Sequence, residues 1–138
     1  MEQTVAQVIR LDVPSSLRWV HTLHAIITEI LNQMALDEES NDQINLAVVE
    51  AGTNAIKHGN QEDPEKRAYF EFIIQPDLFT VVIQDEGPGF NRDEVPDPMQ
   101  PENLFKSSGR GLFLIESCMD DVTYEKSGTL VRMVKKLT

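Results

Sequence analysis

The hydrophobic pattern of this chain changes from helical to strand-like spacing near its midpoint, and this change is the strongest constraint on its fold. Apolar residues recur every three or four positions over residues 17–34 and again from about 40 to 59, which predicts two amphipathic helices. Two runs rich in β-branched and aromatic residues follow at 69–74 and 79–83, and the short segment between them predicts a β-hairpin. This order indicates helices packed against a sheet.

The remaining elements complete a two-layer arrangement. Partly alternating apolar residues at 5–13 predict a first strand, and a third helix is expected over about 112–119. Two closing strands at 122–125 and 130–134 flank a turn at 126–128. Three helices and about five strands, the last four in two hairpins, indicate an α+β fold. We expect a two-layer α/β sandwich whose largely antiparallel sheet is covered on one face, as a single domain over residues 1–138.

The helix ends carry recognisable boundary signals. The segment 14–16 interrupts the first strand and offers a cap for the first helix, while the polar cluster 40–42 is expected to begin the second. The second helix is expected to end near Gly59, after Lys57 and His58, because a basic last turn and a terminal glycine are favourable there.

Charge and cysteine content exclude several classes of function. The chain holds 12 Lys plus Arg against 23 Asp plus Glu, a net charge of −11, which disfavours a direct nucleic-acid partner. The single cysteine, Cys118, cannot form an internal disulfide, and with three scattered histidines it cannot build a metal cluster. Because no signal peptide or membrane-spanning run is visible, we expect a cytoplasmic protein with no membrane partner.

Glu50 and Asn54 lie four residues apart on the second predicted helix and therefore share one face. The amide oxygen of Asn54 is a hard ligand of the kind that Mg²⁺ accepts, and Glu50 is suited to take a proton from an attacking hydroxyl or water. A solvated helix face with an incidental acid and amide is the alternative reading of this segment alone.

Two glycine-containing motifs follow. Asp85, Gly87 and Gly89 come directly after a predicted strand, where an aspartate can accept a hydrogen bond from an exocyclic amine such as that of adenine. A plain turn would use the same residues. Gly109 and Gly111 flank Arg110 just before Leu112 and the third helix, and unpaired amides at a helix start attract anions such as phosphate. An ordinary glycine-rich helix entry is the alternative.

A proline-rich segment of more than twenty residues, 85–108, contains the first motif and leads to the second, with no sustained apolar period. Loops of this length in compact domains are usually functional or disordered. The order of the motifs is therefore an acid and amide on a helix, an aspartate and glycines after a strand, a long loop, and glycines before a helix.

In this order the three segments resemble the nucleotide-binding motifs of the GHKL ATPase superfamily, which includes gyrase and the histidine kinases. More narrowly, the chain resembles the anti-sigma-factor serine kinases over residues 16–136. The resemblance implies the ATP-binding fold of that superfamily, of the Bergerat type, with a lid over the nucleotide at about 90–108. It also implies ATP and Mg²⁺ as cofactors.

The resemblance assigns roles position by position. Glu50 resembles the family's catalytic base, Asn54 its Mg²⁺ ligand, and Asp85 the aspartate that binds the adenine amine. The other positions that the resemblance places at the nucleotide are Lys57, His58, Gly87, Gly89, Gly109, Arg110, Gly111, Leu112 and Thr129. For Lys57 and His58, a favourable position at a helix C-terminus is an equal explanation.

The resemblance further implies a serine/threonine protein kinase that phosphorylates a small anti-anti-sigma (STAS-type) protein and sequesters a sigma factor or an analogous regulator. Family members pair through the first strand and helix, which implies a homodimer, and Arg18 on that helix is a candidate sigma contact. The alternative is a nucleotide-dependent binding module that traps a partner without phosphoryl transfer. The presence of both Glu50 and Asn54 favours the kinase, since a pure trap need not keep a base.

Overall fold

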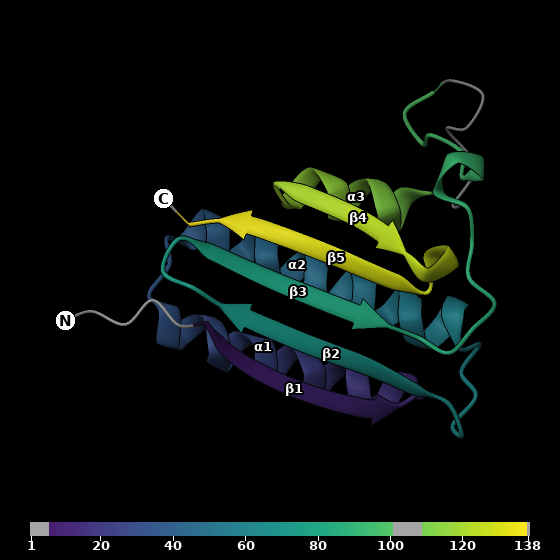
Figure 1. Cartoon of the computed structure of the whole chain (residues 1–138), viewed down its shortest axis with the longest axis horizontal. Helices are drawn as coiled ribbons and strands as arrows, with labels where there is room; N and C mark the ends of the chain where they lie inside the picture. Colours follow the sequence, from purple (N-terminus) through teal and green to yellow (C-terminus); the bar gives the residue numbers. More distant parts are fainter. Residues whose placement is uncertain (1–5, 101–108, 138) are drawn as a thin grey trace.

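A five-stranded sheet with the order β1-β2-β3-β5-β4 forms the framework of the computed structural model, which describes residues 6–100 and 109–137 (Figure 1). The strands are β1 (Gln7–Pro14), β2 (Arg67–Ile74), β3 (Leu78–Gln84), β4 (Asp121–Glu125) and β5 (Leu130–Lys136). Every neighbouring pair is antiparallel, and β2–β3 and β4–β5 are the two expected hairpins. The predicted strand pairing is therefore confirmed.

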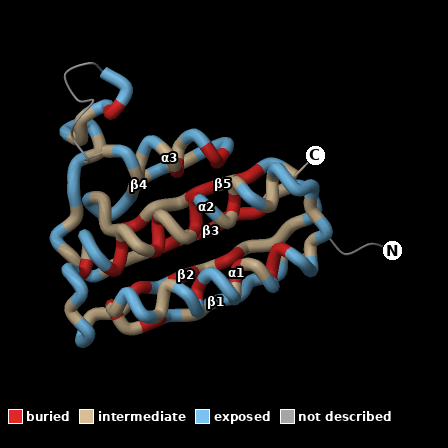
Figure 2. The backbone as a smooth tube through the Cα atoms, turned by 180° about the vertical axis from the view of Figure 1, so that it is seen from behind, coloured by how far each residue is buried: buried red, intermediate tan, exposed pale blue. Residues whose placement is uncertain are grey.

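Helices cover one face of this sheet, as Figures 1 and 2 show from opposite sides. They are α1 (Val20–Met34), entered through a 3₁₀ turn at Leu17–Trp19, α2 (Glu38–Asn54), and α3 (Arg110–Cys118). Beyond α2 the helix continues as a wider π-helical turn, Ala55–Gly59. The expected α+β class is confirmed. No helix in the described part of the chain is both long and apolar enough to cross a bilayer.

The hydrophobic core fills the space between α1, α2 and the covered face of the sheet. Buried residues line the helix surfaces that face the strands in Figure 2. The rings of Phe72 and Phe79 stack with their centroids 6.3 Å apart. Gly52 of α2 allows close packing here, because a methyl group in its place would lie 2.5 Å from Leu23 and 3.2 Å from Phe70. Cys118 is buried, which agrees with a packing role.

The described helices leave the opposite face of the sheet uncovered (Figure 1). This face carries ion pairs between neighbouring strands. Arg10 of β1 lies 2.6 Å from Glu71 of β2, and Arg132 of β5 lies 3.0 Å from Glu125 of β4. These pairs are solvent-exposed, so each contributes little to stability.

The start of the first helix differs from the prediction. Ser16 occupies the N-cap position of the 3₁₀ turn but makes no side-chain capping bond. The neighbouring Ser15 is buried instead, and its hydroxyl donates a 2.7 Å hydrogen bond to the carbonyl of Lys66. The polar signal of segment 14–16 thus belongs to a contact with the start of β2.

The second helix begins earlier than the cluster 40–42 suggested. Asp37 is its N-cap, and the carboxylate accepts a 3.2 Å hydrogen bond from the backbone N–H of Ser40. This contact lowers the pKa of Asp37. The expected start at 40–42 is therefore wrong by less than one turn, because Asp37 supplies the cap and Glu38 and Glu39 occupy a first turn that favours acidic side chains.

Candidate functional site

The predicted site segments meet at one end of the sheet, where α2 ends, β3 ends and β5 begins (Figure 1). Glycines lie where these segments approach one another most closely. A methyl group on Gly59 would overlap the carboxylate of Asp85, and one on Gly111 would overlap that of Glu50. The structure therefore brings the C-terminal half of α2 against the second glycine-containing motif, and the π-helical turn that follows α2 against the first.

Glu50 and Asn54 lie on the side of α2 that faces the start of α3. Both side chains are half-buried. A Cβ atom placed on Gly111 would lie 3.1 Å from Cδ of Glu50 and 3.4 Å from Nδ2 of Asn54. The absence of a side chain at Gly111 thus leaves space beside the acid and the amide, next to the backbone amides of the first turn of α3.

The π-helical turn changes the explanation of Gly59. Asn60 donates its backbone N–H to the carbonyl of Ala55 at 2.8 Å, five residues back. Gly59 does not have a positive φ, so it is not a left-handed helix terminus as the sequence suggested. The positive φ values fall on Gln61 and Glu62. Gly59 is required instead because the Asp85 carboxylate occupies the space that a side chain would fill.

Asp85 is held by the backbone on both sides. Its N–H donates to the carbonyl of Thr129 at 2.9 Å, and its Oδ1 accepts the N–H of Gly87 at 2.8 Å. Burial raises the pKa of the Asp85 carboxyl, and the Gly87 hydrogen bond and the charge of Lys66 only partly oppose this. A partly desolvated carboxylate in a fixed orientation is suited to accept a hydrogen bond from a ligand amine.

Two glycines shape the turn after Asp85. A methyl group on Gly87 would overlap the carbonyl of Gly59 and lie 3.1 Å from Oδ1 of Asp85. Gly89 has φ +82° and packs against the backbone of Ser127. A Cβ on Gly89 would lie 3.4 Å from Cγ2 of Thr129, so Thr129 does lie beside this motif.

Thr129 contacts the turn that carries Asp85 through its backbone and not through its side-chain hydroxyl. The hydroxyl donates to the carbonyl of Lys126 at 2.8 Å, within the β4–β5 connection. Its own carbonyl holds the N–H of Asp85.

The start of α3 carries the second glycine motif. Gly109 is the N-cap residue with φ +87°, and its carbonyl accepts the N–H of Phe113 at 2.9 Å. A Cβ on Gly109 would overlap the carbonyl of Pro96. Arg110 is exposed and Leu112 is half-buried. The first-turn amides of α3 therefore begin where Glu50 and Asn54 approach, the arrangement that suits an anion.

The described part of the expected lid is fastened to α3 and β4. Arg92 donates two hydrogen bonds to Glu116 of α3, at 2.7 and 2.8 Å, and this contact lowers the pKa of the Glu116 carboxyl. The Tyr124 hydroxyl donates to the same carboxylate at 3.1 Å, and its ring lies 5.4 Å from that of Phe90. Residues 101–108 of the expected lid lie outside the described residues.

Two remaining candidates stand apart from these contacts. Lys57 and His58 lie in the π-helical turn and are exposed. Within residues 6–100 and 109–137, neither side chain forms a hydrogen bond or an ion pair with Asp85.

Two cavities in the described part of the chain lie away from the acid and amide. A cavity of about 780 Å³ is lined by residues 88–93, Glu116 and residues 122–128, beside the fastened segment. A second, of about 990 Å³, lies at the far end of the sheet between α1 and β1. Neither is lined by Glu50, Asn54 or Asp85.

The polar groups at this site are of the kinds that bind a magnesium nucleotide. Asn54 offers an amide oxygen and Glu50 a carboxylate, both beside a helix start whose Gly111 leaves space. Asp85 provides an oriented acceptor at the other end of the same region. These observations are consistent with a nucleotide whose triphosphate lies near the start of α3 and whose adenine ring lies near Asp85.

Gly111→Ala tests this geometry. We expect the fold to be retained, because the added methyl meets the far end of the Glu50 side chain, which can move. We expect phosphoryl transfer to fall by about 10²-fold, since a displacement of about 1 Å at a reacting group costs that much. The measurement is a transfer assay beside thermal unfolding. Ser117→Ala, on the exposed side of the same helix, should leave both unchanged, and normal transfer by Gly111→Ala would contradict the arrangement.

Comparison with known proteins defines the class. Residues 13–135 match the family described as "Histidine kinase-like ATPase domain", and the chain belongs to this family. Among curated relatives, the serine-protein kinase RsbW of Staphylococcus aureus strain JH9 is 32% identical over 143 residues, covering 96% of this chain and 89% of the relative. The serine-protein kinase RsbW of Staphylococcus epidermidis is 30% identical over 141 residues, with the same coverage.

A solved structure shares the fold. The crystal structure of the RsbU and RsbW domains of Rv1364c from Mycobacterium tuberculosis matches with a TM-score of 0.65 at 12% identity. The match covers 94% of this chain and 31% of that longer chain. Together the matches confirm the expected family, the anti-sigma-factor serine kinases of the GHKL superfamily, and the expected enzyme class, a serine/threonine protein kinase that uses ATP.

Gly59 and Asn60 were not among the predicted site residues. A glycine and an asparagine after a helix are usual helix-end and turn formers, so nothing local distinguishes a contact with Asp85 and Glu86 that is some twenty-five residues distant in sequence.

Proposed function

We propose that this chain transfers the γ-phosphoryl group of ATP, bound with Mg²⁺, to a serine or threonine hydroxyl of a STAS-type anti-anti-sigma protein. The observation that carries the proposal is the approach of Glu50 and Asn54 to Gly111 at the start of α3, with Asp85 at the same end of the sheet. Such a transfer needs a carboxylate to take a proton, an amide oxygen that can bind a metal ion, backbone amides that can bind phosphate, and an acceptor for the adenine amine.

Each residue has a distinct task in the proposed reaction. Glu50 takes the proton of the acceptor hydroxyl as it attacks, and Asp85 accepts a hydrogen bond from the adenine amine. The first amides of α3 and Arg110 bind phosphate oxygens. Asn54 is the residue that would hold Mg²⁺, which supplies neutralisation of the phosphate charge. The protein's main contribution is positioning and charge stabilisation, as is general for phosphoryl transfer.

The proposed output is partner switching. The kinase sequesters a sigma factor or an analogous regulator until the unphosphorylated STAS protein competes for it. We further propose a homodimer that pairs through β1 and α1, and a cytoplasmic location. Arg18, which is exposed and stacks its guanidinium 5.2 Å from the centroid of the Trp19 ring, is the candidate contact for the sigma factor.

The test is incubation of the purified chain with labelled MgATP and a STAS-type protein of the same organism. We expect acid-stable label on a serine or threonine of the STAS protein. Stable, nucleotide-dependent complex formation without label would replace the kinase by a binding module that traps its partner. Acid-labile label would indicate phosphorylation of histidine and contradict the proposed acceptor.

A further inference from the structure

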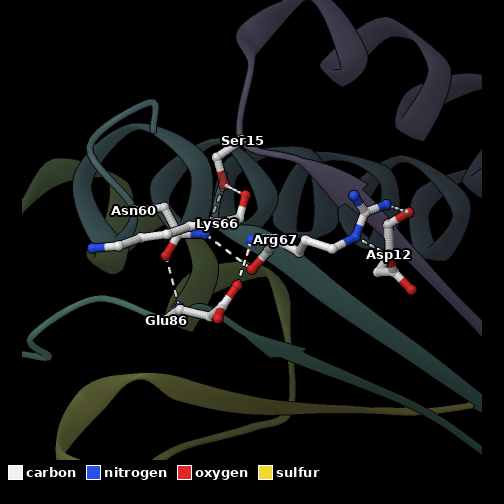
Figure 3. A network of polar contacts seen from close by, with 6 residues as sticks. All are labelled: Asp12, Ser15, Asn60, Lys66, Arg67 and Glu86. Carbon is white, nitrogen blue, oxygen red and sulfur yellow. Dashed lines mark hydrogen bonds and ion pairs between the residues drawn. The ribbon is translucent and has the colours of Figure 1, made fainter. Parts of the chain in front are cut away.

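A fully buried asparagine lies where the last turn after α2 meets the sheet. Asn60 follows directly on Gly59 and has no exposed surface. Figure 3 shows its side chain inside a polar network that joins the π-helical turn, β1, β2 and the turn after β3. The residues drawn are Asp12, Ser15, Asn60, Lys66, Arg67 and Glu86.

The side-chain amide of Asn60 both accepts and donates hydrogen bonds. Its Oδ1 accepts the backbone N–H of Glu86 at 2.7 Å. Its Nδ2 donates to Oγ of Ser15 at 2.7 Å and to the carbonyl of Arg67 at 3.0 Å. Among short side chains, asparagine combines an acceptor with two N–H donors, so this set of partners specifies Asn60 chemically.

Three consecutive backbone N–H groups after β3, those of Asp85, Glu86 and Gly87, each have a hydrogen-bond partner. The N–H of Asp85 donates to Thr129 and that of Gly87 donates to the Asp85 carboxylate. The N–H between them, that of Glu86, donates to Asn60. Asn60 is therefore the link between the end of the helix and the middle of the turn that carries Asp85.

Two adjacent residues thus control the place of one carboxylate. Gly59 leaves the space that the Asp85 carboxylate occupies, and Asn60 holds the next peptide group by its N–H. Glu86 strengthens the link, because its Oε2 accepts the backbone N–H of Arg67 at 2.5 Å. A shift of the Glu86 peptide would move Asp85 relative to Gly59 and hence relative to a bound base.

We propose that Asn60 is a positioning residue for Asp85 and thereby sets the preference of this kinase for adenine over guanine nucleotides. The inference rests on the proposed binding of the base at Asp85. Guanine presents a carbonyl oxygen where adenine presents its amine, so discrimination depends on where the Asp85 acceptor stands.

Ser15→Ala provides a matched control. Ser15 is as buried as Asn60, and its hydroxyl joins the same network through Nδ2. The change removes that bond and leaves the Asn60–Glu86 bond in place. Both Ser15→Ala and Asn60→Ala should lower thermal stability, but only Asn60→Ala should alter the base preference.

The experiment measures the dissociation constants of ADP and GDP by calorimetry for the wild type and both variants, with thermal unfolding alongside. We expect Asn60→Ala to lower the GDP/ADP ratio of dissociation constants by about tenfold, as for one lost positioning hydrogen bond, and Ser15→Ala to leave it within about twofold. Failure of the wild type to bind ADP would overturn the proposed function as well. Wild-type binding with an unchanged ratio in Asn60→Ala would overturn this inference alone.

If Asn60→Ala does not fold, a second variant and a second measurement test the same inference. Asn60→Ser keeps a polar group but is too short to reach the Glu86 N–H, and should reproduce the loss of preference. Amide hydrogen exchange at Glu86 should be faster in a folded Asn60 variant than in Ser15→Ala, because only the former frees that N–H. Equal exchange in both variants would contradict the positioning role.

Discussion

Glu50→Ala is expected to abolish phosphoryl transfer while leaving ATP binding largely unchanged. The side chain lies beside Gly111 at the start of α3, where an acceptor hydroxyl would meet the phosphate. Loss of a positioned general base lowers a rate by about 10²–10⁴-fold. Binding should persist because the contacts to the base and phosphates come from other residues. Initial rates of transfer to the STAS protein and ATP titration by calorimetry measure the two effects separately.

Two further variants make this result interpretable. Glu50→Gln keeps the size and hydrogen-bonding capacity of the side chain but cannot take a proton, so it should be nearly as inactive as Glu50→Ala. Glu39→Ala removes an exposed glutamate from the first turn of the same helix and should transfer at the normal rate. A normal rate for Glu50→Ala would show that its assignment as the base is wrong.

Asp85→Asn is expected to weaken nucleotide binding itself. The carboxylate is oriented by Gly87 and partly desolvated, so it is a stronger acceptor for an amine than the neutral amide that replaces it. We expect the ADP dissociation constant to rise by about tenfold or more, as for the loss of a charge-assisted hydrogen bond. Asp77→Asn, in the exposed β2–β3 connection, is the control and should bind normally.

The pH dependence of binding should carry the same signature. Burial raises the pKa of Asp85 above its ordinary value of 3.8, and the amine requires the ionised carboxylate. Affinity should therefore fall with decreasing pH, starting above the range of an exposed aspartate, and Asp85→Asn should lack this component. The contribution of Asp85 to the stability of the free protein should change in the opposite sense, because a carboxyl whose pKa is raised by folding favours the folded state when it is protonated. Identical pH profiles for wild type and Asp85→Asn would contradict the assignment.

The sequence was sufficient to predict the element types, because helical and strand periods are local signals. The spacing of Val48, Ala51 and Ala55 identifies the buried side of α2, and the alternation in β2 identifies its inner face. Hairpin connections then predicted the antiparallel pairing. The start of α2 was misplaced because Asp37 and the polar cluster 40–42 offer competing caps, and the periodic pattern does not distinguish them.

The candidate site was predicted in its parts but not in its internal contacts. Glu50, Asp85 and Gly111 each belong to a recognisable motif. The reason for Gly59 was misread, since a glycine at a helix end ordinarily signals a left-handed residue. Its true requirement is the Asp85 carboxylate lying over it, a contact between distant segments that spacing within a helix cannot reveal. Asn60 escaped notice for the same reason.

The contact between Pro96 and Gly109 has a consequence for how this enzyme family can vary. Because these two residues lie against each other, the two ends of the stretch that joins them are held at one place. Each doubling in the length of such a stretch costs only about 0.6 kcal/mol of closure entropy. A change in the length of that stretch is therefore expected to cost little, whereas one added residue between Asp85 and Gly89 would disrupt the hydrogen bonds that hold the Asp85, Glu86 and Gly87 N–H groups.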